Sequence, residues 1–149
     1  MENIELIATC AFGLESTVKL ELQQLGYTDL TVRNGGVTFK AGIDAICRAN
    51  LWLRTADRIL IKAGEFPART FSELFENTRS LPWEQWLPQN AQFPVEGKSV
   101  KSQLFSVPDC QAIVKKAIVE KLKTKYHCQW FEETGAKYRI QVSLLKDIA

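Results

Sequence analysis

The chain has 149 residues and a mass of 16.9 kDa, which fits one ordinary domain or two small ones. Apolar residues make up 46% of it and charged residues 24%, close to the globular average, so intrinsic disorder and a fibrous repeat are excluded. No apolar run approaches the ~20 residues that cross a bilayer, and the first residues lack the basic start of a signal peptide. We therefore expect a cytoplasmic protein that is neither exported nor inserted in a membrane.

The first 66 residues alternate between strand-like and helix-like patterns. Asn34-Gly35-Gly36 separates two alternating β-rich runs, and because these residues tolerate positive φ we expect a hairpin there. The predicted elements are a strand over 4–10, a helix over 14–25 that Gly26 ends, strands over 30–33 and 37–40, a helix over 43–56 and a strand over 58–63. The order βαββαβ predicts a ferredoxin-like domain over residues 1–66.

Residues 67–149 have a different pattern. Thr70-Phe71-Ser72-Glu73 matches a capping box at the start of a short helix, which should end where two prolines bracket Trp83 and Trp86. We expect these two tryptophans to pack in the core rather than to stack on nucleic-acid bases. Ser106 with Pro108 predicts the start of a helix that runs to about Tyr126, and residues 137–145 alternate like a strand. No closing element is predicted after that strand, which suggests a fragment of a longer protein.

The sequence offers no set of catalytic, cofactor or metal residues. The four cysteines, at 10, 47, 110 and 128, form no Cys-x-x-Cys pair, and His127 is the one histidine. We expect buried, reduced thiols rather than a zinc site or disulfides. The sequence lacks a glycine-rich cofactor loop, a phosphate-binding loop and a nucleophile with a spaced base.

The basic residues are concentrated in the second half. Residues 1–66 carry a net charge of −1 and residues 67–149 a net charge of +3, with seven lysines against two acids over 98–126. This asymmetry favours a polyanionic partner, although a solvated helix face is the more common explanation of lysine-rich helices. At helical spacing Lys116 and Lys123 lie opposite the apolar stripe, so the lysines do not form one row.

Several motifs, in this order and spacing, resemble one family. The chain is similar to the amino-terminal part of the THUMP-containing, S-adenosylmethionine-dependent RNA methyltransferases, of the YpsC or ribosomal large-subunit methyltransferase L type. The resemblance spans the whole chain, and the motifs that carry it are residues 9–15, 34–39, 50–58, 71–75, 81–84 and 101–106.

The resemblance implies an α+β protein in which a ferredoxin-like domain, residues 1–66, precedes a THUMP RNA-binding domain, residues 67–149. In the family a following Rossmann-like domain with an Asn-Pro-Pro-Tyr motif methylates a guanine exocyclic amine with S-adenosylmethionine. That motif does not occur here, so the chain is expected to be the ribosomal-RNA-binding half of such an enzyme. Family members continue with a further strand, which implies a truncated THUMP sheet whose edge, Tyr138–Leu145, is open to self-association.

The resemblance also places the RNA-facing side chains between residues 98 and 116. Lysines would neutralise phosphates, and hydroxyl and amide groups would hydrogen-bond them. The expected set is Lys98, Lys101, Ser102, Gln103, Ser106, Gln111, Lys115 and Lys116. Two alternatives remain open: a protein-interaction module that docks a partner through Trp83, Trp86 and the sheet edge, and, more distantly, a small-molecule-binding ferredoxin-like enzyme.

Overall fold

The computed structural model describes residues 2–149, which form two compact units: unit 1 ends at Lys62 and unit 2 is Ala63–Ala149. None of the helices in this described range is long and apolar enough to span a membrane. The elements are β1 (Ile4–Thr9), α1 (Glu15–Gln24), β2 (Leu30–Arg33), β3 (Gly36–Ala41), α2 (Asp44–Trp52) and β4 (Arg58–Ile61) in unit 1, and α3 (Phe71–Ser80), the 3-10 helix η1 (Trp83–Gln85), β5 (Val95–Val100), α4 (Val107–Tyr126) and β6 (Ile140–Leu145) in unit 2.

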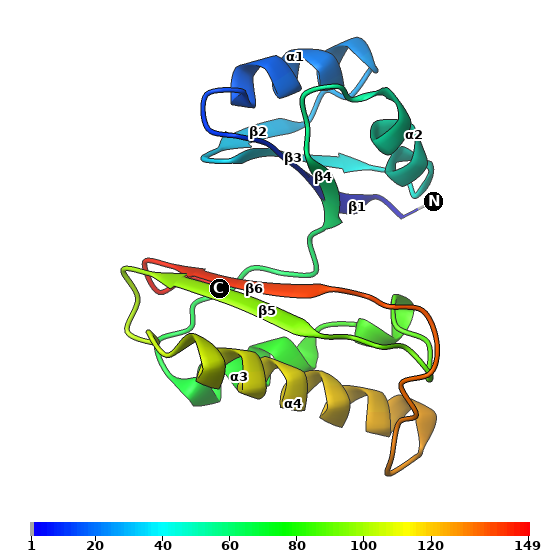
Figure 1. The fold of residues 1–149 in the computed structure, drawn as a ribbon, viewed down its shortest axis with the longest axis vertical. Helices are drawn as coiled ribbons and strands as arrows, with labels where there is room; N and C mark the ends of the chain where they lie inside the picture. The colour runs from blue at the N-terminus through cyan, green and yellow to red at the C-terminus, as the bar shows by residue number, and fades with distance from the viewer. Residues whose placement is uncertain (1) are drawn as a thin grey trace. The chain divides into compact units, whose positions relative to one another are not determined.

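Unit 1 is an antiparallel sheet with strand order β2-β3-β1-β4, and α1 and α2 lie on one of its faces (Figure 1). β1 and β3 pair in a register that places Leu6 opposite Phe39, and both side chains are buried with Val18 and Leu22 of α1. The alternating apolar residues of the strands and the helical spacing in α1 therefore meet in one core. This confirms the predicted ferredoxin-like βαββαβ fold.

The β2–β3 hairpin and the loop after β1 are tied together by Glu15. Its carboxylate accepts hydrogen bonds from the backbone N–H groups of Gly35, at 3.1 Å, and of Gly13, at 2.8 Å. The hydrogen bond from Gly35 is the main cause that holds the pKa of Glu15 below its ordinary value. Gly35 has a φ of +83°, so the predicted positive-φ glycine of the hairpin is confirmed.

Unit 2 packs α3, η1 and α4 against one face of a two-stranded parallel sheet, β5–β6 (Figure 1). Trp83 is 6% exposed, and its Nε1–H donates to the Thr78 carbonyl at 2.7 Å. The Trp86 ring meets Trp83 edge-on, with 6.0 Å between ring centroids. The prediction that both tryptophans serve packing is confirmed, and the fold is α+β, as predicted.

The last residues of the chain form a turn that the sequence did not predict. Lys146 and Asp147, with φ of 50° and 64°, form a two-residue turn that returns Ile148 to pair antiparallel with Leu145. Ala149 and Phe66 then exchange backbone hydrogen bonds of 2.8 and 2.9 Å. No further strand follows β6 in the described range, as expected, but the turn and the bridge were not predicted, because lysine gives no sequence signal of a left-handed turn. Beyond this bridge, the side of β6 away from β5 has no strand partner within residues 2–149.

The expectation of buried, reduced thiols is met by some of the cysteines and not by others. All four are free, and Cys10 and Cys110 are buried, which raises the pKa of both thiols. Cys47 is exposed on α2, so the prediction of burial is wrong for this residue. It lies between Ile43 and Leu51 at helical spacing, and these side chains are 67% and 79% exposed.

Candidate functional site

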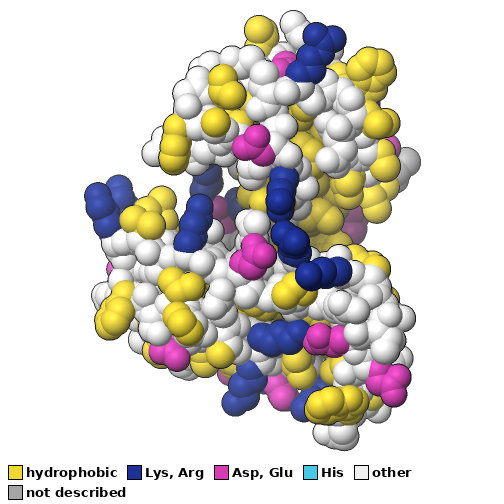
Figure 2. Space-filling view, in the orientation of Figure 1, with side chains coloured by type: hydrophobic (Ala, Val, Ile, Leu, Met, Phe, Trp, Pro, Cys, Tyr) yellow, Lys and Arg dark blue, Asp and Glu magenta, His cyan; other side chains and the backbone are white. Residues whose placement is uncertain are grey.

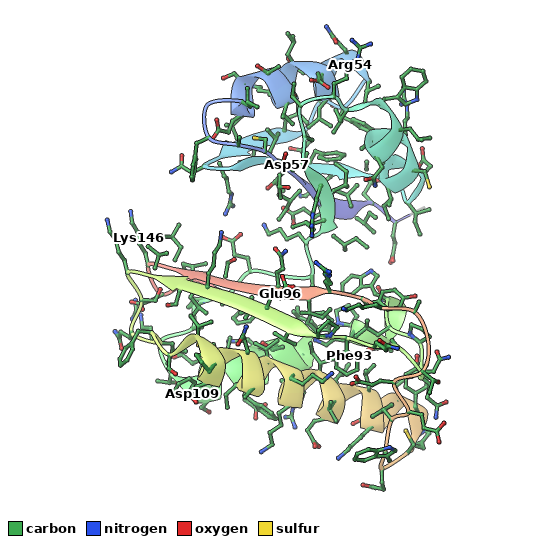
Figure 3. All side chains as sticks on the ribbon, viewed as in Figure 1. Arg54, Asp57, Phe93, Glu96, Asp109 and Lys146 are labelled. Carbon is green, nitrogen blue, oxygen red and sulfur yellow. The ribbon has the colours of Figure 1, made fainter. Side chains whose placement is uncertain are left out.

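The candidate site lies where the two parallel strands of unit 2 finish. Residues 101–106 connect β5 to α4, and Lys146 is the first residue after β6. The backbone N–H of Lys146 donates to the Val100 carbonyl at 3.2 Å, so the two strand ends are neighbours. Figure 3 labels Lys146 at this end of the sheet and Asp109 at the start of α4. We call Lys101, Gln103, Ser106 and Lys146 the strand-end surface.

Hydrogen bonds between the two loops make this surface a fixed platform. The backbone N–H of Gln103 donates to Asp147 Oδ1 at 2.7 Å, and the Asp147 N–H donates to Ser102 Oγ at 3.0 Å. Within the first loop, Ser99 Oγ donates to the Leu104 carbonyl at 2.6 Å. Segments more than 40 residues apart in the sequence are therefore held in one arrangement before any ligand arrives.

The charges on the platform are available for a ligand. Lys101 and Lys146 are exposed, and neither ammonium group forms an ion pair with a residue in the described range 2–149. Figure 2 shows Lys and Arg side chains beside hydrophobic side chains at the end of unit 2 where the strands finish, and further Lys and Arg side chains across the rest of this face. An exposed pair of unpaired lysines on rigid backbone is suited to an anionic ligand.

The hydroxyl groups of the predicted set differ in their availability. Ser102 Oγ donates to the Val100 carbonyl at 3.1 Å and also accepts from Asp147, so it is already used within the fold. Ser106 is the N-cap residue of α4, as predicted, but its side chain makes no capping hydrogen bond. The Ser106 hydroxyl and the exposed Gln103 side chain remain free to bind a ligand.

Two predicted residues lie on opposite faces of the sheet. Lys98 is exposed on the face of β5 that the helices leave open, whereas Gln111 on α4 packs over the covered face. A Cβ placed on Gly97 would lie 3.1 Å from Gln111 Cγ, which shows how closely that side chain lies on the strand. The structure therefore does not bring Lys98 and Gln111 together.

The two predicted lysines of α4 are also separate from the strand-end surface. Lys115 Nζ donates to Glu133 Oε1 at 2.7 Å and to the Phe93 carbonyl at 3.0 Å, and it lies 3.6 Å from the centroid of the Phe93 ring. Lys116 is exposed, but it follows Ser106 by ten residues, a helical rise of about 15 Å. Lys115 is tied within the fold, and Lys116 lies at the periphery of the site.

Sequence reasoning missed two basic residues, Lys146 and Arg69. The backbone N–H of Ala68 donates to the Asp147 carbonyl at 2.8 Å, so the segment that carries exposed Arg69 runs beside the turn that carries Lys146. A sequence signal was available: a strand before the predicted helix and a strand after it form a parallel pair, and a parallel pair places both carboxyl ends at the same edge of the sheet.

The arrangement has the character of a binding surface. Within residues 2–149 no three His, Cys, Asp or Glu side chains gather as metal ligands. The strand-end surface presents ammonium, amide and hydroxyl groups, which bind phosphate oxygens without covalent chemistry.

Comparison with known families agrees with this architecture. Residues 5–60 match the RlmL ferredoxin-like domain, and residues 68–149 match the THUMP domain. The chain belongs to the THUMP domain family. Its THUMP domain is unit 2, and the strand-end surface lies entirely within the matched residues.

Relatives share both domains of this THUMP protein. The protein named "Putative RNA methyltransferase YpsC", from Bacillus subtilis, is 56% identical over the whole chain, which covers 39% of that protein. A crystal structure of "a predicted N6-adenine-specific DNA methylase" from Listeria monocytogenes is 57% identical with a TM-score of 0.95, and the match covers 99% of this chain and 39% of that one. Another, described as "a putative methyltransferase complexed with SAH", is 49% identical with a TM-score of 0.93 over 99% of this chain and 40% of that one.

A more distant relative carries a more specific name. The "Ribosomal RNA large subunit methyltransferase K/L" of Cellvibrio japonicus is 31% identical over 80% of this chain, which corresponds to 16% of that protein. The chain thus spans 39% of YpsC and a smaller part of the K/L enzyme.

Proposed function

We propose that unit 2 binds RNA through the strand-end surface, and that the chain is the substrate-binding half of an RNA methyltransferase. The observation that carries the proposal is the position of two unpaired lysines, Lys101 and Lys146, on a rigid platform inside the THUMP domain. The name of the Bacillus relative, an RNA methyltransferase, supports the choice of ligand and reaction.

The binding chemistry follows from the groups present. Lys101 and Lys146 neutralise backbone phosphates, and Gln103 and Ser106 hydrogen-bond the same oxygens. Such contacts fix the position of the RNA and do not distinguish one base sequence from another. Of the residues proposed from the sequence, Lys98 and Lys116 extend the positive field, whereas Ser102, Gln111 and Lys115 support the fold.

The finer identity of the reaction is part of the proposal. The ribosomal substrate is supported by the name of the K/L relative, and the guanine N2 target by the family resemblance of the sequence. The cofactor is S-adenosylmethionine, supported by the relative crystallised with SAH, and it binds to a catalytic domain of the parent enzyme. Because one similar structure is described as a DNA methylase, DNA is the ligand against which RNA must be tested.

The proposal predicts salt-dependent binding that depends on two side chains. Two phosphate contacts at ~0.7 released ions each give a slope of log affinity against log salt of roughly −1.5, and Lys101→Ala or Lys146→Ala flattens it by ~0.7. Lys40→Ala, which removes an exposed lysine of unit 1, leaves the slope unchanged. The measurement is fluorescence anisotropy of a structured ribosomal RNA fragment at several salt concentrations.

Two results would contradict this function. If Lys101→Ala and Lys146→Ala bind with the affinity and slope of the parent, the strand-end surface is not the site. If a DNA of the same sequence and structure binds as tightly as the RNA, the 2′-hydroxyl is not recognised and RNA is not the preferred ligand.

A protein-interaction function has one observation in its favour, on unit 1. Ile43, Leu51 and Trp52 are 67%, 79% and 66% exposed around α2, whereas Trp83, expected to serve such docking, is buried. A partner bound through this apolar surface would associate with little dependence on salt, and Leu51→Ser would weaken it without changing RNA affinity.

A further inference from the structure

A shallow hollow lies between the first turns of α3 and α4. Its volume is about 290 Å³, and it is lined by Phe71, Asp109, Ala112 and Ile113. Pockets for drug-sized molecules measure ~300–1,000 Å³, so this hollow has room for one small ring system. The surface that lines the hollow is almost entirely apolar, and Asp109 is the one charged residue among the four.

Phe71 forms a fixed aromatic wall of the hollow. Thr70 Oγ1 accepts a hydrogen bond from the Glu73 N–H at 3.1 Å, and the Glu73 carboxylate accepts one from the Arg69 N–H at 2.9 Å. This reciprocal cap determines where α3 begins, and therefore the position of its first residue, Phe71. The Phe71 side chain is 39% exposed, which leaves ring surface for stacking.

Asp109 supplies an acceptor without a partner. It is exposed in the first turn of α4 and makes no ion pair or side-chain hydrogen bond with the described part of the chain. An ionised carboxylate only accepts hydrogen bonds, and its two oxygens can accept two parallel donors. Among the bases, guanine presents two adjacent donors, N1–H and the N2 amino group, on its Watson–Crick edge, whereas adenine, cytosine and uracil place an acceptor beside each donor.

Two lining residues of the hollow are close in the chain to basic or polar residues at the strand ends. Asp109 follows Ser106 by three residues on α4, and Phe71 follows Arg69 by two. The segment before α3 is joined to the turn that carries Lys146 through the hydrogen bond from Ala68 to Asp147. A nucleotide whose base occupied the hollow would therefore direct its phosphates towards the basic residues.

We propose that this hollow binds one unpaired guanine of the RNA, with Phe71 stacked on the base and the Asp109 carboxylate accepting its N1–H and N2–H donors. The inference rests on the proposed RNA binding and adds base selectivity to it. A single-stranded nucleotide is required, because both the ring face and the Watson–Crick edge must be free.

The test uses one RNA hairpin with a short single-stranded tail that carries guanine, inosine, adenine, cytosine or uracil at one position. Inosine keeps the ring and N1–H of guanine and lacks the N2 amino group. The parent chain should bind the guanine tail roughly 5-fold or more tightly than the others, as expected for a bidentate base contact. Asp109→Asn should remove this preference and keep the salt slope, because no phosphate contact is lost.

Matched variants separate recognition from folding. Asp44→Asn changes an exposed acid in the first turn of another helix, α2, and should leave the guanine preference intact. Phe71→Leu should weaken binding to every tail by a similar factor, and Phe71→Tyr should restore it, since the tyrosine ring also stacks. Circular dichroism of each variant checks that α3 and α4 are retained.

The outcomes distinguish the two proposals. Salt-dependent binding with no preference for guanine, or a preference that survives Asp109→Asn, overturns the guanine site and leaves the RNA-binding function standing. Absence of salt-dependent binding by the parent overturns both.

Discussion

Lysines of unit 2 differ in the contacts that their side chains make within the fold. Lys115 Nζ is held by Glu133 and by the Phe93 carbonyl and ring, whereas Lys101 and Lys146 have no ion-pair partner within the described residues. A cation that is already hydrogen-bonded would have to give up those contacts before it could bind a phosphate. In the proposed function, the lysines that bind RNA are therefore those whose ammonium groups have no partner within the fold.

Lys115→Ala should therefore lower stability and leave RNA affinity unchanged. It removes a half-exposed ion pair, a charged hydrogen bond to a carbonyl and a cation–π contact, together worth about 1–2 kcal/mol. Lys116→Ala, the adjacent exposed lysine, should change the free energy of unfolding by less than about 0.5 kcal/mol. Urea unfolding followed by circular dichroism measures both, and equal unfolding midpoints would contradict the structural role of Lys115.

At the scale of elements, contacts of the β2–β3 hairpin with β1 and with the loop after it explain why glycine occupies positions 35 and 36. The loop after β1 and the β2–β3 turn are separate motifs in the sequence, yet Glu15 joins them through hydrogen bonds from Gly13 and Gly35. Gly36 is the first residue of β3, and a Cβ there would lie 2.9 Å from the Ala8 carbonyl oxygen of β1. Gly35 is required for its backbone angle, and Gly36 for the close approach of a neighbouring strand.

These two reasons predict different responses to substitution. Gly35→Val should cost about 1–2 kcal/mol because a β-branched residue is strained at positive φ, and Gly35→Asn should cost less because asparagine tolerates that conformation. Gly36→Val should cost about 1–3 kcal/mol through the clash with β1. Hydrogen exchange of the β3 amides would report the loss, and unchanged protection in both valine variants would refute this account of the hairpin.

At the scale of the whole molecule, the chain consists of a ferredoxin-like domain and a THUMP domain, and its sequence contains no glycine-rich cofactor loop. It covers 39% of the length of its Bacillus relative. The remainder of that relative lies outside the match.

We accordingly predict that this chain alone neither binds S-adenosylmethionine nor transfers a methyl group. A cofactor of that size needs a shaped pocket, and the hollow between α3 and α4 has room for one ring system. Isothermal titration calorimetry with the cofactor should give no saturable heat up to millimolar concentration. Binding at micromolar concentration would show that part of the cofactor site lies on these two domains.

The sequence alone determined the order of elements and the division of charge. Apolar spacing, the Asn34-Gly35-Gly36 turn and the Thr70–Glu73 cap depend on contacts between residues close in the chain, so local patterns predict them. Ordered motifs were enough to suggest the family. The burial of Cys47 was wrongly predicted, because an exposed apolar helix face has the same spacing as a buried one.

Only the tertiary structure decided which residues share the site. Parallel pairing of β5 with β6 brings Lys146 beside Lys101, and the same sheet separates Lys98 from Gln111 on opposite faces. The ammonium group of Lys115 contacts Glu133 and the Phe93 ring instead of lying at the strand-end surface. The hollow forms because Phe71 and Asp109, which are 38 residues apart in the chain, lie in the first turns of neighbouring helices. These relations depend on register and packing between distant segments, which hydrophobic periodicity does not encode.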